Sequence, residues 1–156
     1  MTVALRKAQQ ADLPLIHSMQ VSAFMPILEK YHDYDLSPAA EGKERIAERF
    51  EQPFTVYWLI MAEGQPVGAM RVCDFGERCR VSPIFVLPEH HGHGYGQQAM
   101  VLAEEIYTDA SVWELDTILQ EPGLCRMYER LGYKPTGKTE HIKDGMDIVF
   151  YEKKIR

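Results

Sequence analysis

The sequence predicts a single α+β domain in which strands alternate with amphipathic helices. At 156 residues and 46% hydrophobic composition, the chain is long enough to bury a substantial core and short enough to form one domain. Apolar residues recur at helical spacing in four segments, whereas β-branched and aromatic residues dominate the segments between them. No repeat and no low-complexity linker divides residues 1–156, so one domain with one site is expected.

The first third of the chain predicts two helices joined by a loop. Asp12 offers a helix N-cap, and the proline in the following turn is tolerated because that position needs no helical N–H. We expect this helix to kink or end near Pro26, since a proline inside a helix removes a hydrogen bond. Residues 31–37 are expected to form a loop. A second amphipathic helix is expected over residues 38–50, with Ser37 as its cap.

Six strands and two further helices are expected elsewhere. A short strand begins at Leu5, and the other strands, marked by β-branched and aromatic residues, cover residues 54–61, 67–73, 80–87, 113–120 and 146–151. A glycine-containing turn joins the first two of these longer strands into a hairpin. Helical spacing returns over residues 97–107 and 122–131, and Gly132 is suited to end the second of these helices.

Charge and composition exclude several classes of partner. The formal net charge is −6 and the basic residues are scattered, so no positive stripe is present for a nucleic-acid backbone. No window approaches the roughly 20 apolar residues of a membrane span. The three cysteines lack C-x-x-C spacing, which argues against a disulfide framework or a zinc site and favours a reducing compartment. A cytoplasmic protein is expected, and its acidic surface is compatible with a cationic small molecule.

The most informative segment is a glycine-rich turn, V-L-P-E-H-H-G-H-G-Y-G-Q-Q-A-M over residues 86–100, between an expected strand and an expected helix. Glycines let several backbone N–H groups converge on one point, and a helix N-terminus adds partial positive charge, so the turn suits a pyrophosphate. The spacing matches neither the G-x-G-x-x-G of dinucleotide folds nor the G-K-[ST] of nucleotide-triphosphate loops. The adjacent histidines, His90, His91 and His93, lack the spacing of a metal site, and no metal is expected.

Two motifs resemble the GNAT superfamily of N-acetyltransferases. His91, Gly94 and Gly96 occupy the pattern Q/R-x-x-G-x-G/A of that family's acyl-coenzyme A loop. Further along, residues 121–133 are similar to the family's N-x-x-A-x-x-x-Y-x-x-x-G-F, and residues 115–117 resemble its L-E-V strand. The resemblance covers nearly the whole chain. It implies a mixed, mostly antiparallel sheet of six or seven strands flanked by about four helices.

The resemblance also implies acetyl-coenzyme A (acetyl-CoA) as the cosubstrate. In this family the strand before the loop pairs with the pantetheine arm, and backbone N–H groups of the loop hold the pyrophosphate. The thioester would then lie near Phe85, beside an open seam between the strands expected over residues 80–87 and 113–120. The cofactor-binding residues so implied are Phe85, Val86, Leu87, His91, Gly92, His93, Gly94, Tyr95, Gly96 and Gln97.

Tyr128 and Asp116 are the catalytic residues that the resemblance implies. Tyr128 matches the tyrosine that protonates the departing thiolate of coenzyme A in many family members. Asp116 is the first candidate for the general base, because relatives often carry a strand carboxylate there. His90 and Glu89 are second choices, and ordered water is a further alternative. The chain departs from the family pattern at His91, His93 and Glu121, where relatives carry Gln or Arg, Lys or Arg, and Asn.

The expected function is transfer of an acetyl group from acetyl-CoA to a primary amine by direct attack in a ternary complex. Acidic and aromatic residues in the loop over residues 31–37 suit an ammonium group, and the acceptor is expected there. Small amines, polyamines, aminoglycosides, amino acids, peptide N-termini and lysine side chains all stay open as acceptors. Homodimers are common among similar proteins. Two alternatives are a non-catalytic acyl-CoA sensor that docks a protein partner and a binding protein for another phosphate-bearing ligand.

Overall fold

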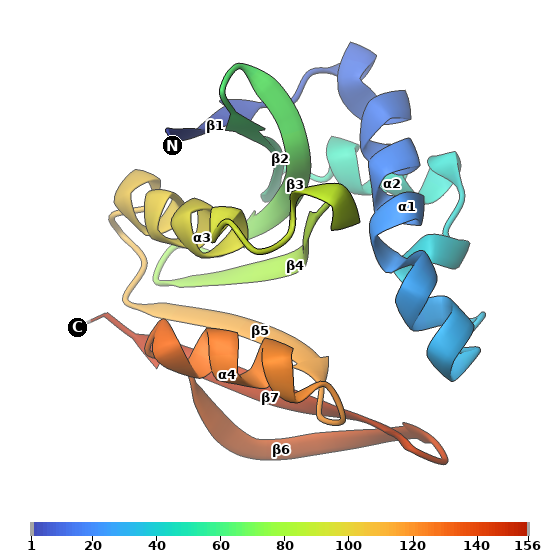
Figure 1. Ribbon diagram of the computed structural model, residues 1–156. Coiled ribbons are helices and arrows are strands. Elements are labelled where there is room, and N and C mark those ends of the chain that lie inside the picture. Colours follow the sequence, from blue (N-terminus) through green and yellow to red (C-terminus); the bar gives the residue numbers. More distant parts are fainter. Residues whose placement is uncertain (1, 156) are drawn as a thin grey trace.

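The computed structural model describes residues 2–155, in which seven strands form one sheet. The strands are β1 (Val3–Lys7), β2 (Thr55–Ala62), β3 (Gln65–Asp74), β4 (Arg78–Val86), β5 (Val112–Ile118), β6 (Lys134–Lys143) and β7 (Met146–Lys154). The helices are α1 (Leu13–Tyr31), α2 (Lys43–Glu51), α3 (Tyr95–Ile106) and α4 (Pro122–Arg130), with short 3₁₀ turns η1 (Gln10–Asp12), η2 (Pro38–Ala40) and η3 (Pro88–His90). The strand order is β1-β2-β3-β4-β5-β7-β6, and only β4 and β5 pair in parallel among the described residues (Figure 1). The mixed, mostly antiparallel sheet is confirmed.

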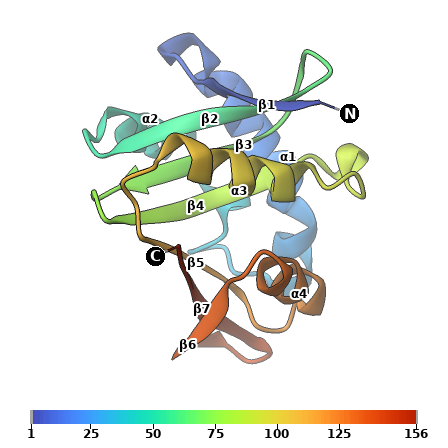
Figure 2. The same cartoon turned by 90° about the vertical axis from the view of Figure 1, so that its left-hand side faces the viewer.

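Two apolar clusters, one on each face of the sheet, hold the helices in place. Helices α3 and α4 pack with Met70 and Trp113 on one face, whereas α1 and α2 pack around Ile16 on the other. Leu59 and Ile60, adjacent in β2, belong to different clusters because successive strand residues point to opposite faces. Figure 2 shows α1 and α3 on opposite sides of the strands. No helix within residues 2–155 combines the length and apolar character needed to cross a membrane.

Helix α1 continues through Pro26 to Tyr31, so the expectation that it could end near that proline is wrong. The lost hydrogen bond is tolerated because packing holds the helix on both sides of the proline. The ring of Phe24 lies 5.7 Å from that of Phe85, and Tyr31 is buried. His32, with a φ of 56°, adopts the left-handed conformation that ends the helix.

The helix expected over residues 38–50 is instead two separate elements. Ser37 caps only the turn η2, where its hydroxyl oxygen accepts a hydrogen bond from the N–H of Ala39 at 3.2 Å. Glu41 then has an extended ψ of 139°, which breaks the helical path, and Gly42 is the N-cap of α2. The predicted start of the helix was wrong because the extended backbone at Glu41 and Gly42, rather than the apolar spacing, decides where α2 begins.

Strand β6 was not among the six expected strands. Eight of its ten residues are exposed and the other two are half-buried, so it lacks the alternation of apolar and polar residues that marks a half-buried strand. It pairs only with β7, at the edge of the sheet. Tertiary pairing therefore creates this strand, and the sequence pattern gives no local signal for it.

Strands β4 and β5 separate soon after they begin to pair. Their register covers three residue pairs, from Arg78 with Val112 to Arg80 with Glu114. Beyond that point β4 runs on to Val86 and β5 to Ile118 without pairing with each other, and Figure 1 shows the two strands diverging. We call the unpaired space between them the β4–β5 opening. It corresponds to the open seam that the sequence analysis expected.

Candidate functional site

The loop between β4 and α3 presents unpaired backbone donors. Gly92 and Gly94 have φ values of 87° and 74°, in the left-handed region that favours glycine, and Gly94 is the N-cap of α3. Within residues 2–155, the backbone N–H groups of Gly92, His93, Gly94, Gly96 and Gln97 have no acceptor. They lie at the N-terminus of a helix of 12 residues, whose dipole adds partial positive charge. These donors are available to an anionic ligand.

The three loop histidines make different contacts. The Nε2–H of His91 donates to the carbonyl oxygen of Val86 at 2.7 Å, which ties the loop back to the end of β4. His93 stacks on Tyr95 with 5.2 Å between ring centroids, and His90 lies 6.5 Å from the same ring. The loop contains no lysine or arginine. An anion bound here would therefore be held by backbone N–H groups and neighbouring imidazoles rather than by a permanent cation.

The free edge of β4 lies next to this loop. On one side β4 pairs with β3, including Phe85 with Ala69 and Val86 with Gly68. On the other side its described pairing with β5 ends at Arg80, which leaves the backbone of the later residues facing the opening. The N–H of Leu87 donates to the carbonyl of Val67 at 2.8 Å, so contact with the β3 side continues just beyond the end of β4. A ligand that paired with β4 as an added strand would use the opposite, free edge.

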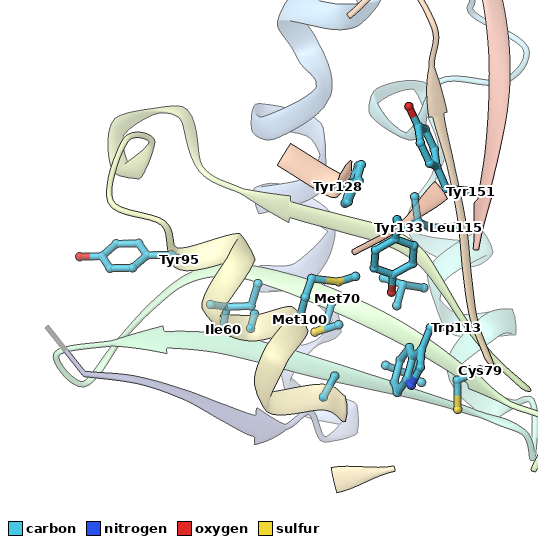
Figure 3. Packing of buried hydrophobic residues seen from close by; sticks show 14 of the residues in the cluster. Ile60, Met70, Cys79, Tyr95, Met100, Trp113, Leu115, Tyr128, Tyr133 and Tyr151 are labelled. Carbon is cyan, nitrogen blue, oxygen red and sulfur yellow. The ribbon is translucent and has the colours of Figure 1, made fainter. Parts of the chain in front are cut away.

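Tyr128 comes to the opening from α4. Its side chain is 6% exposed and meets the ring of Tyr133 edge-on, with 6.1 Å between the ring centroids. Figure 3 shows Tyr128 in the same buried cluster as Tyr133 and Leu115. Its hydroxyl has no hydrogen-bond partner among the described residues, and the hydroxyl oxygen is not completely buried. Burial, followed by the charges of Asp116 and Cys125, raises the pKa of Tyr128 above its ordinary value, so the phenol keeps its proton.

Asp116 lies on β5 at the narrow end of the opening. Its carboxylate forms an ion pair with Arg80 on β4, and this ion pair spans the two strands where their pairing ends. The Asp116 charge also acts on Tyr128, so the structure brings the two expected catalytic residues to one opening. Glu89 and His90 lie in η3, at the opposite end of β4.

Glu121 makes contacts that the sequence analysis missed. The hydroxyl of Tyr31 and the Nζ of Lys30 both donate to Oε2 of Glu121, at 2.5 Å and 2.6 Å. We call these three residues the α1–α4 clasp. The departure of Glu121 from the family pattern was visible in the sequence. Its partners were not visible, because they lie about 90 residues away in the chain.

Arg71 is a second residue that the sequence analysis missed. It lies on β3 with its Nε donating to the carbonyl oxygen of Ser82 at 2.6 Å and its Nη1 donating to Oε1 of Gln52 at 3.2 Å. Ser82 belongs to β4, within the stretch that borders the opening. An isolated arginine in a strand gave no signal of this position.

Residues 21–133 match the protein family described as the Acetyltransferase (GNAT) family. The chain belongs to this family. Its members transfer acyl groups, and this GNAT protein is accordingly an acyltransferase. The earlier resemblance of the loop and of residues 121–133 to GNAT motifs is thereby confirmed.

Solved GNAT structures share the fold at low sequence identity. The ribosomal-protein-S18-alanine N-acetyltransferase from Escherichia coli is 12% identical, with a TM-score of 0.79 over 99% of this chain and 94% of that one. The spermidine N-acetyltransferase from Vibrio cholerae, in complex with CoA and spermine, is 16% identical, with a TM-score of 0.75 over 96% and 94%. The PaiA N-acetyltransferase from Thermoplasma acidophilum, in complex with CoA, is 16% identical, with a TM-score of 0.78 over 99% of both chains. No curated protein matches the sequence significantly.

Proposed function

We propose that this GNAT protein transfers an acetyl group from acetyl-CoA to a primary amine by direct attack in a ternary complex. The observation that carries the proposal is that unpaired loop donors, a free strand edge, a protonated phenol and a carboxylate lie around one opening. Unpaired donors of the glycine loop and the free edge of β4 lie along one side of the opening. A neutral phenol and a carboxylate, from Tyr128 and Asp116, lie at the same opening.

Acetyl-CoA fits the loop and the strand edge, and it would supply the activated acyl carbon. The N–H groups of Gly92, His93, Gly94, Gly96 and Gln97 would hold its pyrophosphate, because they are unpaired donors at a helix N-terminus. The exposed edge of β4 up to Val86 would pair with the pantetheine arm. CoA in the solved V. cholerae and T. acidophilum acetyltransferases supports this choice of cosubstrate.

Tyr128 is proposed as the general acid. Burial keeps its phenol protonated, and its hydroxyl has no protein acceptor to hold the proton among the described residues. Its proton can pass to the sulfur as the C–S bond breaks, because negative charge then develops on the sulfur beside the phenol. The phenol is therefore a proton source at the leaving sulfur and is otherwise inert.

Asp116 is proposed as the general base, positioned by Arg80. The ion pair with Arg80 fixes the orientation of the Asp116 carboxylate at the narrow end of the opening. A proton from the incoming ammonium would pass to Asp116 directly or through one water. Glu89 and His90 are less well placed, because η3 lies at the loop end of β4, away from Asp116.

A panel of amines assayed for release of free CoA thiol tests the proposal. We expect acetyl-CoA to be cleaved only when a suitable amine is present, because the mechanism needs both substrates together. Tight binding of acetyl-CoA without turnover on any amine would favour the non-catalytic sensor. A failure to prefer acetyl-CoA over other phosphate-bearing ligands would overturn the cosubstrate assignment.

A further inference from the structure

Strand β4 contains a β-bulge just beyond its last pairing with β5. The residues on either side of Arg71 in β3 pair with Ile84 and Val81 of β4, so Arg71 alone faces two residues, Ser82 and Pro83. One extra residue in one strand of an antiparallel pair bends that strand and increases its twist. The bulge therefore lies where β4 and β5 separate, and it contributes to the β4–β5 opening.

The bulge decides which face of the sheet each later residue of β4 reaches. Before the bulge, Cys79 and Val81 belong to the cluster that holds α3, and a regular strand would place Phe85 on that same face. Phe85 instead belongs to the cluster around α1, where its ring lies 5.7 Å from that of Phe24. Val86 packs against the α3 cluster. One inserted residue thus reverses the alternation and sets the orientation of the part of β4 that borders the opening.

The Arg71 side chain contacts this bulge directly. Its Nε donates to the carbonyl oxygen of Ser82 at 2.6 Å, and its Nη1 donates to Oε1 of Gln52 at 3.2 Å. Gln52 is the C-cap of α2, so the arginine joins the bulge to the end of that helix. No carboxylate within residues 2–155 forms an ion pair with Arg71. These two hydrogen bonds therefore orient its half-buried side chain.

The hydrogen bond from Arg71 stabilises a backbone that lacks the regular strand pairing. A bulge disrupts the ladder locally, and Pro83 has no backbone N–H with which to add a hydrogen bond. A guanidinium donor makes a stronger hydrogen bond than a neutral donor does. Because Ser82 precedes Ile84 by only two residues, fixing its carbonyl also fixes the start of the free edge over residues 84–86.

We propose that Arg71 is a positioning residue for acetyl transfer, which fixes the β4 bulge so that the strand edge beyond it can pair with the pantetheine arm of acetyl-CoA. Arg71 contacts neither substrate in this scheme and acts through the carbonyl of Ser82. The inference rests on the proposed function, and it names the side chain that prepares the β4 edge for the cosubstrate. Loss of the hydrogen bond should therefore weaken binding of the pantetheine arm and leave binding of the diphosphate unchanged.

Two variants of similar size separate the hydrogen bond from the charge of the side chain. Arg71→Gln keeps an N–H donor at the chain position of Nε, whereas Arg71→Met places a methyl group there. The affinity for CoA, measured by calorimetry, should fall about tenfold in Arg71→Met, as for the loss of one or two hydrogen bonds, and by less than about threefold in Arg71→Gln. Adenosine diphosphate (ADP) has the diphosphate but no pantetheine arm, so its affinity should change by less than about twofold in both variants.

Hydrogen exchange in the ligand-free protein tests the same contact without a cosubstrate. We expect the amides of residues 84–86 to exchange at least about tenfold faster in Arg71→Met than in the unchanged protein, whereas exchange in β5 and β7 should not change. In Arg71→Gln the exchange of residues 84–86 should stay near that of the unchanged protein. A general loss of stability would instead raise exchange throughout the sheet.

Arg45→Met is the matched control. Arg45 and Arg71 line the same small cavity beside α2, but Arg45 pairs with Glu48 and not with β4, so CoA affinity and exchange should stay unchanged. Equal losses of CoA and ADP affinity in Arg71→Met, equal effects of Arg71→Met and Arg71→Gln, or unchanged exchange in Arg71→Met would each overturn the inference. If the unchanged protein does not bind CoA, the proposed function fails instead, and hydrogen exchange still decides whether Arg71 fixes the bulge.

Discussion

Tyr128 shows how one side chain can carry both a structural and a chemical role. Its ring packs against Tyr133 in the core, and burial raises the pKa of Tyr128 above its ordinary value, so the phenol is neutral at neutral pH. Tyr133 belongs to the same cluster, is 1% exposed, and also has an unpaired hydroxyl. The two phenols are alike in burial but differ in their expected role.

Replacement of Tyr128 by Phe is expected to lower the rate of acetyl transfer at least about tenfold while the affinity for acetyl-CoA stays near normal. The ring, and hence the packing, is kept, whereas the proton for the leaving thiolate is lost. Steady-state thiol release and calorimetric titration with acetyl-CoA measure the two quantities. Tyr133→Phe is the control and should leave both unchanged. Unchanged turnover in Tyr128→Phe would remove Tyr128 from the mechanism.

At the residue scale, the sequence predicted what local spacing determines. The glycines of the loop and Tyr128 belong to short motifs in which each residue has a fixed place relative to a strand or a helix. Arg71 could not be found in this way, because its hydrogen bonds to Ser82 and Gln52 form only when β3 pairs with β4 and the residue after α2 packs beside it. The pairing of Asp116 with Arg80 likewise depends on the parallel contact of β4 and β5.

At the element scale, the loop between β4 and α3 depends on glycine conformation. Gly94→Ala is expected to cost about 1 kcal/mol of folding free energy, because its φ of 74° is unfavourable for alanine. Relief of this strain should rotate the loop amides and weaken acetyl-CoA binding by about tenfold or more. Gly145→Ala is a matched control in the β6–β7 turn, with a φ of 80° and open space for the new methyl group. It should lose similar stability with no change in affinity, and an equal effect on affinity would contradict the role of the loop.

The contact between β3 and β4 gives a second prediction at this scale. A Cβ atom at Gly68 would lie 2.1 Å from the carbonyl oxygen of Phe85, so β4 must move if the residue is enlarged. We expect Gly68→Ala to lower the free energy of unfolding by about 2 kcal/mol, measured by urea denaturation. Gly123→Ala, where a methyl group meets nothing within 4 Å, should cause no loss. An equally stable Gly68→Ala protein would show that β4 is not held this closely.

Elements with their own apolar pattern were predicted, and those that depend on tertiary context were not. Strand β2 alternates between two buried clusters and was found from sequence, whereas β6 is exposed along its length and was missed. Helix α1 passes through Pro26 because packing on both sides outweighs one missing hydrogen bond. The sequence pattern shows where apolar faces lie, but it does not show how strongly other elements hold them.

At the scale of the whole molecule, the α1–α4 clasp joins the two layers of the protein. Helices α1 and α4 belong to opposite faces of the sheet, yet Lys30 and Tyr31 at the end of α1 reach Glu121, the N-cap of α4. The clasp links the face on which an acceptor is expected to the helix that carries Tyr128. We expect it to help fix α4 relative to α1.

The clasp makes the stability of the protein depend on the ionisation of Glu121. Burial opposes ionisation, but the hydrogen bonds from Lys30 and Tyr31 outweigh it and lower the pKa of Glu121 below its ordinary 4.5. A group with a depressed folded-state pKa stabilises the protein above its unfolded-state pKa, and that contribution is lost as the pH falls through the folded-state value. Glu121→Gln should therefore be less stable than the unchanged protein at neutral pH, with the difference shrinking as the pH falls below 4.5. Urea denaturation across this range measures it, and Glu140→Gln, on the exposed strand β6, is the control. A stability difference that stayed constant from neutral to acidic pH would show that the Glu121 charge does not hold the two helices together.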